Sequence, residues 1–178
     1  MAQQGDLASM YRLGTGYLSG ECWKADPVLG QKWLQRASDG GHGDAAFQLG
    51  AHQLLHSDRP EESVLHFKRA ALLGNSMAQH QMGMIYLGGI FATADVDKAL
   101  YWLRRAADSG SGMTALILGM LHERGLKGVD QNICKALHWY DLGKQLGMPE
   151  GARHSERLQP NIDENCPTIP INADAMRD

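Results

Sequence analysis

The chain has 178 residues, of which 43 % are apolar and 21 % charged, and its formal net charge is −3. This length suits one soluble domain that buries a hydrophobic core of its own. Acidic and basic residues are mixed along the chain, so no basic stripe points to nucleic acid and no polybasic cluster points to a membrane surface.

Cysteine usage and the first residues bear on the compartment. The three cysteines, Cys22, Cys134 and Cys166, are odd in number and widely spaced, which does not indicate a disulfide framework and favours a reducing compartment. The start of the chain lacks the basic and apolar regions of a secretory signal, and no apolar run reaches the length of a transmembrane helix. We therefore expect a cytoplasmic protein with no membrane insertion.

One set of residues recurs four times along the chain. Each unit has a small residue, an apolar-Gly pair and usually an aromatic residue further on, then a second aromatic followed by small residues, and it closes on a glycine. The anchors of this pattern are Leu13, Gly14, Tyr17, Trp33, Leu49, Gly50, Gly83, Tyr86, Trp102, Leu118, Gly119 and Trp139. The closing glycines, Gly41, Gly74, Gly110 and Gly147, delimit repeats at about 5–41, 43–74, 76–110 and 112–147.

Each unit is predicted to form two helices. In the first half the small residue, Leu and Tyr fall at i, i+4 and i+8, which is one stripe of an α-helix. The second half begins with a capping aspartate, at Asp26, Asp58, Asp95 and Asp130. The closing glycine suits a left-handed helix C-terminus.

The glycine after each apolar anchor carries packing information. Inside a helix it costs about 1 kcal/mol relative to Ala, so four in register predict that two backbones approach closely there. We expect the tryptophans to fill the space between successive helix pairs.

The segment after the fourth repeat is predicted to close the array. Residues 149–158 look like a polar, degraded first helix, as expected of a C-terminal cap. The repeat domain would then span 1–158. The tail at 159–178 contains Pro160, Pro167 and Pro170 and little periodicity, so it is expected to be disordered or an extended strap.

The motif LGxxYxxG, followed by KAxxW, paired alanines and a closing glycine, resembles the Sel-one-like repeat (SLR) family, a relative of the tetratricopeptide repeat. KALYW at 98–102 and KALHW at 135–139 carry the resemblance, which covers roughly residues 5–153. Repeat 2 departs from the pattern: it lacks the Tyr, has His66 in place of Trp, and has a shorter inter-helix loop. The resemblance implies an all-α, right-handed α/α superhelical solenoid of four helix-turn-helix repeats plus a capping helix, with the first helix of each repeat on the concave side.

A partner-binding groove is predicted on that concave side, beside the core stripe of the first helices. The candidate residues are Arg12, Gln48, His52, Gln81, Ile85, Ile117, Leu121 and Arg124. Arg12 or Arg124 would receive an acidic group of the partner, and nearby methionines such as Met84 and Met113 would be either core or adaptable surface. Two alternatives stay open: these residues contact the neighbouring helix, or the C-terminal tail occupies the groove.

Signals for catalysis or metal binding are weak. Gly14-Thr15-Gly16 lacks the spacing and the preceding strand of a phosphate loop. His52 with His56, and Cys134 with His138, have helical metal-ligand spacing, but neither pair has an evident third ligand. A Cys–His nucleophile would need an orienting group that is not in evidence. We expect no metal, no cofactor and no enzymatic activity.

The sequence therefore predicts a non-catalytic scaffold or adaptor that binds another protein or peptide. The alternatives are a dedicated chaperone or immunity protein for a secreted effector, and a structural fragment of a longer array that self-associates through its N-terminal face.

Overall fold

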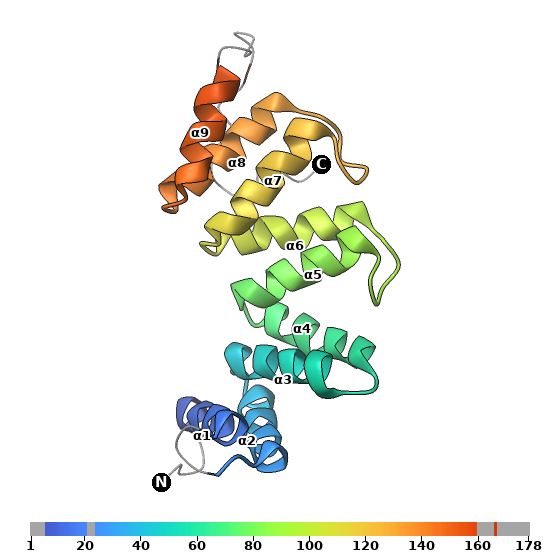
Figure 1. The fold of residues 1–178 in the computed structure, drawn as a ribbon, viewed down its shortest axis with the longest axis vertical. Helices are drawn as coiled ribbons and strands as arrows, with labels where there is room; N and C mark the ends of the chain where they lie inside the picture. Colours follow the sequence, from blue (N-terminus) through green and yellow to red (C-terminus); the bar gives the residue numbers. More distant parts are fainter. Residues whose placement is uncertain (1–5, 21–23, 160–165, 167–178) are drawn as a thin grey trace. The chain divides into compact units, whose positions relative to one another are not determined.

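The computed structural model describes residues 6–20, 24–159 and 166. Within these residues the chain forms nine α-helices and one short 3-10 helix, and no strand is present among them (Figure 1). The helices are α1 (Leu7–Ser19), α2 (Pro27–Asp39), α3 (Gly43–His56), α4 (Ser63–Leu72), α5 (Ser76–Gly88), α6 (Val96–Asp108), α7 (Gly112–Arg124), α8 (Ile133–Gln145) and α9 (Pro149–Leu158), with the 3-10 helix η1 at Pro60–Glu62. The predicted all-α class and the pairing of helices within repeats are confirmed.

The chain divides into two compact units, Met1–Gln79 and His80–Asp178. In the first unit α1 pairs with α2 and α3 with α4, and α2 also packs on α3. Leu34, Ala37, Ala45 and Leu49 form its buried cluster, against which Met10, Tyr11 and Leu18 pack.

In the second unit α7 pairs with α8, α6 packs on α7, and α9 packs on α8. Trp139 lies in a cluster with Leu103, Ala107 and Leu118, so it fills the space between the third and fourth repeats as predicted. A neighbouring cluster joins Leu116, Ala136, Leu137, Tyr140 and Leu158.

The closing glycines end the second helix of each repeat as predicted. Their φ angles are 99° at Gly41, 89° at Gly74, 95° at Gly110 and 83° at Gly147, a left-handed conformation that a side chain would strain. At Gly110 the amide donates to the carbonyl of Ala107, and the next amide, of Ser111, donates to the carbonyl of Ala106. This pair of hydrogen bonds is the Schellman motif, and the same pattern recurs at the other three glycines.

Two of the four predicted caps of the second helices are confirmed and two are wrong. Asp26 accepts a hydrogen bond from the amide of Leu29, and Asp95 accepts one from Lys98. Asp58 does not cap a helix, because η1 intervenes and α4 begins only at Ser63. At α8 the cap is Asn132 rather than Asp130, since the loop continues two residues further.

The burial of the predicted anchors is uneven. Trp102, Trp139, Leu49 and Leu118 are buried, whereas Trp33 is only half-buried and lies under the guanidinium of Arg36. In the first repeat the residue that follows the tryptophan, Leu34, is fully buried. Its counterparts Phe67, Leu103 and Tyr140 are likewise buried.

The predicted capping helix is α9, whose bounds agree with the expected 149–158. Its residues Gly151, Ser155 and Leu158 are buried against the rest of the second unit. A Cβ on Gly151 would lie 2.5 Å from the carbonyl oxygen of Tyr140, so α9 rests directly on the backbone of α8. The predicted tail at 159–178 lies outside the described residues, apart from Gln159 and Cys166.

Candidate protein-binding groove

An open groove of about 990 Å³ runs between α1 and α3, the first helices of repeats 1 and 2, and lies within the first unit. Tyr11, Arg12 and Leu18 line it from α1, and Gln48, His52 and Leu55 line it from α3. The predicted residues Arg12, Gln48 and His52 therefore meet in one cavity. Its volume is at the upper end of the range for small-molecule pockets.

The wall formed by α1 is held in place by its contact with the start of α3. His42 caps α3 by accepting a hydrogen bond from the amide of Ala45, and its ring stacks on Tyr11 with ring centroids 4.8 Å apart. One histidine thus fixes both the beginning of α3 and the orientation of an aromatic residue in the groove. Arg12, one residue further, is exposed, and its Nε donates to the carbonyl of Ala8 at 3.4 Å.

Two histidines of α3, His52 and His56, line the groove. The rings of His52 and His56 have centroids 4.6 Å apart, one helical turn from each other. The amide nitrogen of Gln31, on α2, lies 3.0 Å from Nδ1 of His52 and donates to it when that nitrogen is unprotonated. Burial lowers the pKa of His52, and the neighbouring His56 lowers it further. His52 is therefore neutral near pH 7 and gains its charge only in more acidic solution.

The groove also presents apolar surface. Leu55 is 74 % exposed, although it follows His52 on the same face of α3. Together with Leu18 and Tyr11 it offers contact area to a partner, because burying an exposed leucine contributes about 1.5–3 kcal/mol. Tyr11, Leu18, Leu55 and His56 were missed by the sequence argument. Continuing the spacing from Gln48 and His52 by one further turn would have found Leu55.

The predicted groove residues of the second unit divide into two groups. Ile85 is 8 % exposed and Leu121 is 5 % exposed, so these two are corrected from groove residues to interior residues. Leu121 belongs to the cluster around Trp139, and Ile117 packs against that cluster, as the neighbouring-helix alternative predicts. Gln81 is half-buried and Arg124 is exposed. None of these residues lines the groove between α1 and α3.

Metal chemistry finds little support in the described part of the chain. No group of three or more His, Cys, Asp or Glu side chains is arranged there to hold a metal ion. The pair Cys134 and His138 is excluded as a thiolate site because Cys134 is bonded to another cysteine. No α-helix among the same residues combines the length and hydropathy needed to cross a bilayer.

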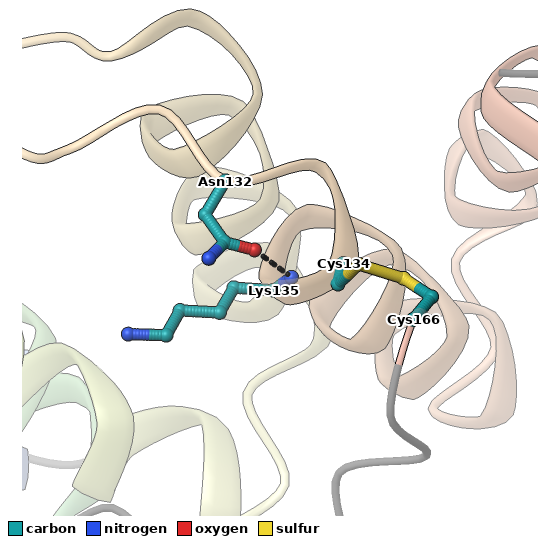
Figure 2. The surroundings of a disulfide bond; sticks show 4 residues. All are labelled: Asn132, Cys134, Lys135 and Cys166. Carbon is teal, nitrogen blue, oxygen red and sulfur yellow. Dashed lines mark hydrogen bonds between the residues drawn. A yellow bond between two sulfur atoms is a disulfide. The ribbon is translucent and has the colours of Figure 1, made fainter. Parts of the chain in front are cut away.

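Cys134, in the first turn of α8, forms a disulfide with Cys166 (Figure 2). The number and spacing of the cysteines did not indicate a disulfide framework, and this bond corrects that expectation for Cys134 and Cys166. Cys22 lies outside the described residues. Cys166 also packs against the cluster of Leu116, Tyr140 and Leu158. The bond fastens one residue of the C-terminal segment to the last repeat.

Hydrogen bonds join the capping helix to the same repeat. The hydroxyl of Tyr140 donates to Glu123 at 2.6 Å, and Arg157 donates to the other carboxylate oxygen at 2.6 Å. His154 stacks on the ring of Tyr140 with centroids 4.6 Å apart. Ser155 donates to Asp141 at 2.7 Å. This network involves α7, α8 and α9 and explains the polar character of the cap.

Paired helices closed by glycine turns, with a groove between first helices, define an α/α repeat protein. The sequence profile of the Sel1 repeat matches residues 7–42, 43–75, 76–111 and 115–148, and the chain belongs to the Sel1 repeat family. These matches agree with the four repeats predicted from the anchors.

Individual relatives support this assignment. The "Sel1-repeat-containing protein YjcO" of Escherichia coli is 28 % identical over 201 aligned residues, which cover 88 % of this chain and 86 % of that protein. The crystal structure of a Sel1 repeat protein from Oxalobacter formigenes matches with a TM-score of 0.76 and 28 % identity over 86 % of this chain, which spans 63 % of the crystallised chain. The immunity protein Pa5087 of Pseudomonas aeruginosa, at 20 % identity and a TM-score of 0.53, shares the fold alone.

Proposed function

We propose that this chain is a non-catalytic protein-binding module, a scaffold or adaptor, and that the groove between α1 and α3 is part of its recognition surface. The observation that carries the proposal is the convergence of exposed apolar and cationic side chains, Leu55 and Arg12, on one open groove of about 990 Å³. The Sel1 repeat solenoid is a protein-interaction fold, which agrees with this reading.

The test is affinity capture from a lysate of the source cell with three forms of the full chain. The groove variant carries Arg12→Glu and Leu55→Glu. The matched control carries Lys68→Glu and Leu65→Glu on α4, which makes the same chemical changes at an exposed lysine and at a leucine that is 72 % exposed. Circular dichroism must show that all three are folded.

A captured protein is then purified, and its dissociation constant is measured against each form. The proposal expects binding by the wild type and the control, and a loss of at least about tenfold in affinity for the groove variant. Equal affinity for all three forms would remove the groove from the recognition surface. A captured protein that proves to be a secreted effector would favour the chaperone or immunity alternative.

We also propose that the chain matures in an oxidising compartment rather than the cytoplasm. The support is the Cys134–Cys166 bond, since structural disulfides persist outside reducing compartments. Alkylation of protein taken from its native cells, followed by mass spectrometry under non-reducing conditions, tests this. Cys134 and Cys166 are expected to resist the alkylating reagent until a reductant is added, and their modification without a reductant would contradict the proposal.

A further inference from the structure

The charge of the groove differs in sign from that of the chain. Its lining residues include Arg12, His52 and His56, and none of the described residues that line it is an aspartate or glutamate, although the chain as a whole carries −3. Arg12 forms no ion pair with any carboxylate in the described part of the chain. Arg12 does act on Asp6, but the pKa of Asp6 is lowered chiefly by its hydrogen bond from Ser9 and only weakly by Arg12. Arg12 is thus available to a partner.

We infer that the groove between α1 and α3 binds a segment of a partner protein that carries a carboxylate next to apolar side chains, and that His52 strengthens this binding as the pH falls. The inference rests on the proposed function and specifies the partner's chemistry. The carboxylate contacts Arg12, and the apolar side chains contact Leu55, Leu18 and Tyr11.

The surroundings of the histidine pair favour an anionic partner. Arg12 faces the pair across the groove from α1. On the other side of His52, a smaller groove of about 320 Å³ is lined by Lys32 of α2 and His66 of α4. Two acids act on His66 there, and both are already paired. Asp39 of α2 forms an ion pair with Arg69. Glu62 of η1 accepts a hydrogen bond from Gln53 and forms an ion pair with Arg59.

A carboxylate bound in the groove therefore supplies a negative charge beside His52 and His56, which the described lining of the groove does not provide. Burial and His56 disfavour the charged form of His52 in the free chain, and a carboxylate in the groove favours it. Because bound ligand and bound proton then stabilise each other, affinity must rise as the solution becomes more acidic. Protonation of His52 also requires the Gln31 side chain to present its carbonyl oxygen to Nδ1 instead of its nitrogen, a rotation of the amide.

A carboxylate-bearing protein segment fits better than nucleic acid. One arginine and two histidines give too little positive charge for a phosphate backbone, which basic stripes usually bind. The exposed leucine in the groove also has no role against phosphates. Peptides and oligonucleotides are therefore separate arms of the test.

The test selects a displayed library of random peptides on the full chain at about pH 6, just below the ordinary histidine pKa. Recovered peptides are synthesised, and their affinities are measured at about pH 6 and about pH 8. Five forms are compared: wild type, Arg12→Glu, Leu55→Glu, the double variant His52→Gln/His56→Gln, and the control Lys68→Glu. A single-stranded oligonucleotide of mixed sequence is measured in parallel.

The inference expects peptides in which Asp or Glu alternates with Leu, Ile, Val or Phe. Their affinity should fall at least about tenfold for Arg12→Glu and stay unchanged for Lys68→Glu. For the wild type it should be about three- to tenfold higher at the lower pH, and this difference should disappear in the double histidine variant.

Other outcomes separate the two proposals. Peptides that depend on Leu55 but carry no acidic residue, or that bind equally at both pH values, would overturn the inference and leave the proposed function standing. Recovery of basic peptides, or tighter binding of the oligonucleotide than of any peptide, would also overturn it. If no recovered peptide is sensitive to Arg12→Glu or to Leu55→Glu, both proposals fail.

Discussion

Gly119 of α7 lies directly against the aromatic ring of Tyr140 of α8. A Cβ added at position 119 would lie 2.5 Å from Cε1 of that ring and 2.6 Å from Cδ1. The same relationship joins Gly14 to Leu34, Gly50 to Phe67 and Gly83 to Leu103. In each repeat, then, the glycine of the first helix receives the side chain that follows the second aromatic anchor. The geometry that recurs in the four helix pairs depends on that missing Cβ.

Gly119→Ala is therefore expected to destabilise the chain by about 1–3 kcal/mol, the usual effect of overpacking a core. The higher helix propensity of alanine than of glycine would stabilise the variant by about 1 kcal/mol. The overpacking outweighs this gain because the ring of Tyr140 is fully buried and has no free space beside it. Urea unfolding measures the difference. Gly88→Ala is the control, since the nearest atoms there are 3.4 Å from the added Cβ. Equal stability of the two variants would show that the helix pair adjusts without cost.

Trp102 and Trp33 occupy equivalent repeat positions but differ in burial, so their replacement should differ in effect. Trp102→Ala is expected to lower the free energy of unfolding by about 3–5 kcal/mol, as a large core aromatic is lost. Trp33→Ala should cost less than half as much, because that side chain is half-buried and lies beneath the exposed guanidinium of Arg36. Thermal unfolding followed by circular dichroism compares the two. A larger loss for Trp33 would contradict the packing of the first repeat.

The buried His122 predicts a loss of stability in acid. Its side chain is 3 % exposed, and burial lowers its pKa, while a hydrogen bond to the carbonyl of Asp130 opposes this in part. The unfolded chain, with an ordinary histidine pKa near 6.5, thus binds more protons as the pH falls through that value. Stability should be full above about pH 6.5 and decline below it. Melting temperatures at a series of pH values should show a shallower decline for His122→Gln, and an unchanged slope would contradict this account.

The Cys134–Cys166 bond should stabilise the second unit. It closes a loop with a sequence separation of 32 residues, for which chain-entropy arguments give about 2–4 kcal/mol. The variant Cys134→Ser/Cys166→Ser should therefore melt at a lower temperature than the wild type. Adding a reductant should lower the melting temperature of the wild type to that of the variant and leave the variant unchanged. A wild type that melts at the same temperature with and without reductant would show that the bond does not contribute.

The features that the sequence predicts well are those set by local chemistry. Gly41 and Gly110 adopt the left-handed angle that few other residues tolerate, so a glycine at a regular interval identifies a helix end. The all-helical class follows from the same regularity. The start of α4 was misplaced because Pro60 begins a 3-10 turn, and nothing near Asp58 distinguishes that turn from the first turn of an α-helix.

The features that escaped prediction depend on tertiary placement. Helical periodicity cannot decide whether Trp33 or its neighbour Leu34 is buried, because adjacent positions both lie near the boundary of the apolar stripe. Cys134 and Cys166 are far apart in sequence, and only the packing of Cys166 on the last repeat brings them together. The groove was found in part: Arg12, Gln48 and His52 meet there, whereas Ile85 and Leu121 are interior because their own repeats pack around them.

Amide hydrogen exchange of the full chain, with and without the partner isolated by capture, tests the central claim most directly. If the groove between α1 and α3 binds the partner, exchange should slow mainly in the segments 8–19 and 43–56, and the slowing should be absent with the Arg12→Glu/Leu55→Glu variant. Slowing confined to α7, α8 and α9, with α1 and α3 exchanging as in the free chain, would contradict the claim and place the recognition surface on the second unit.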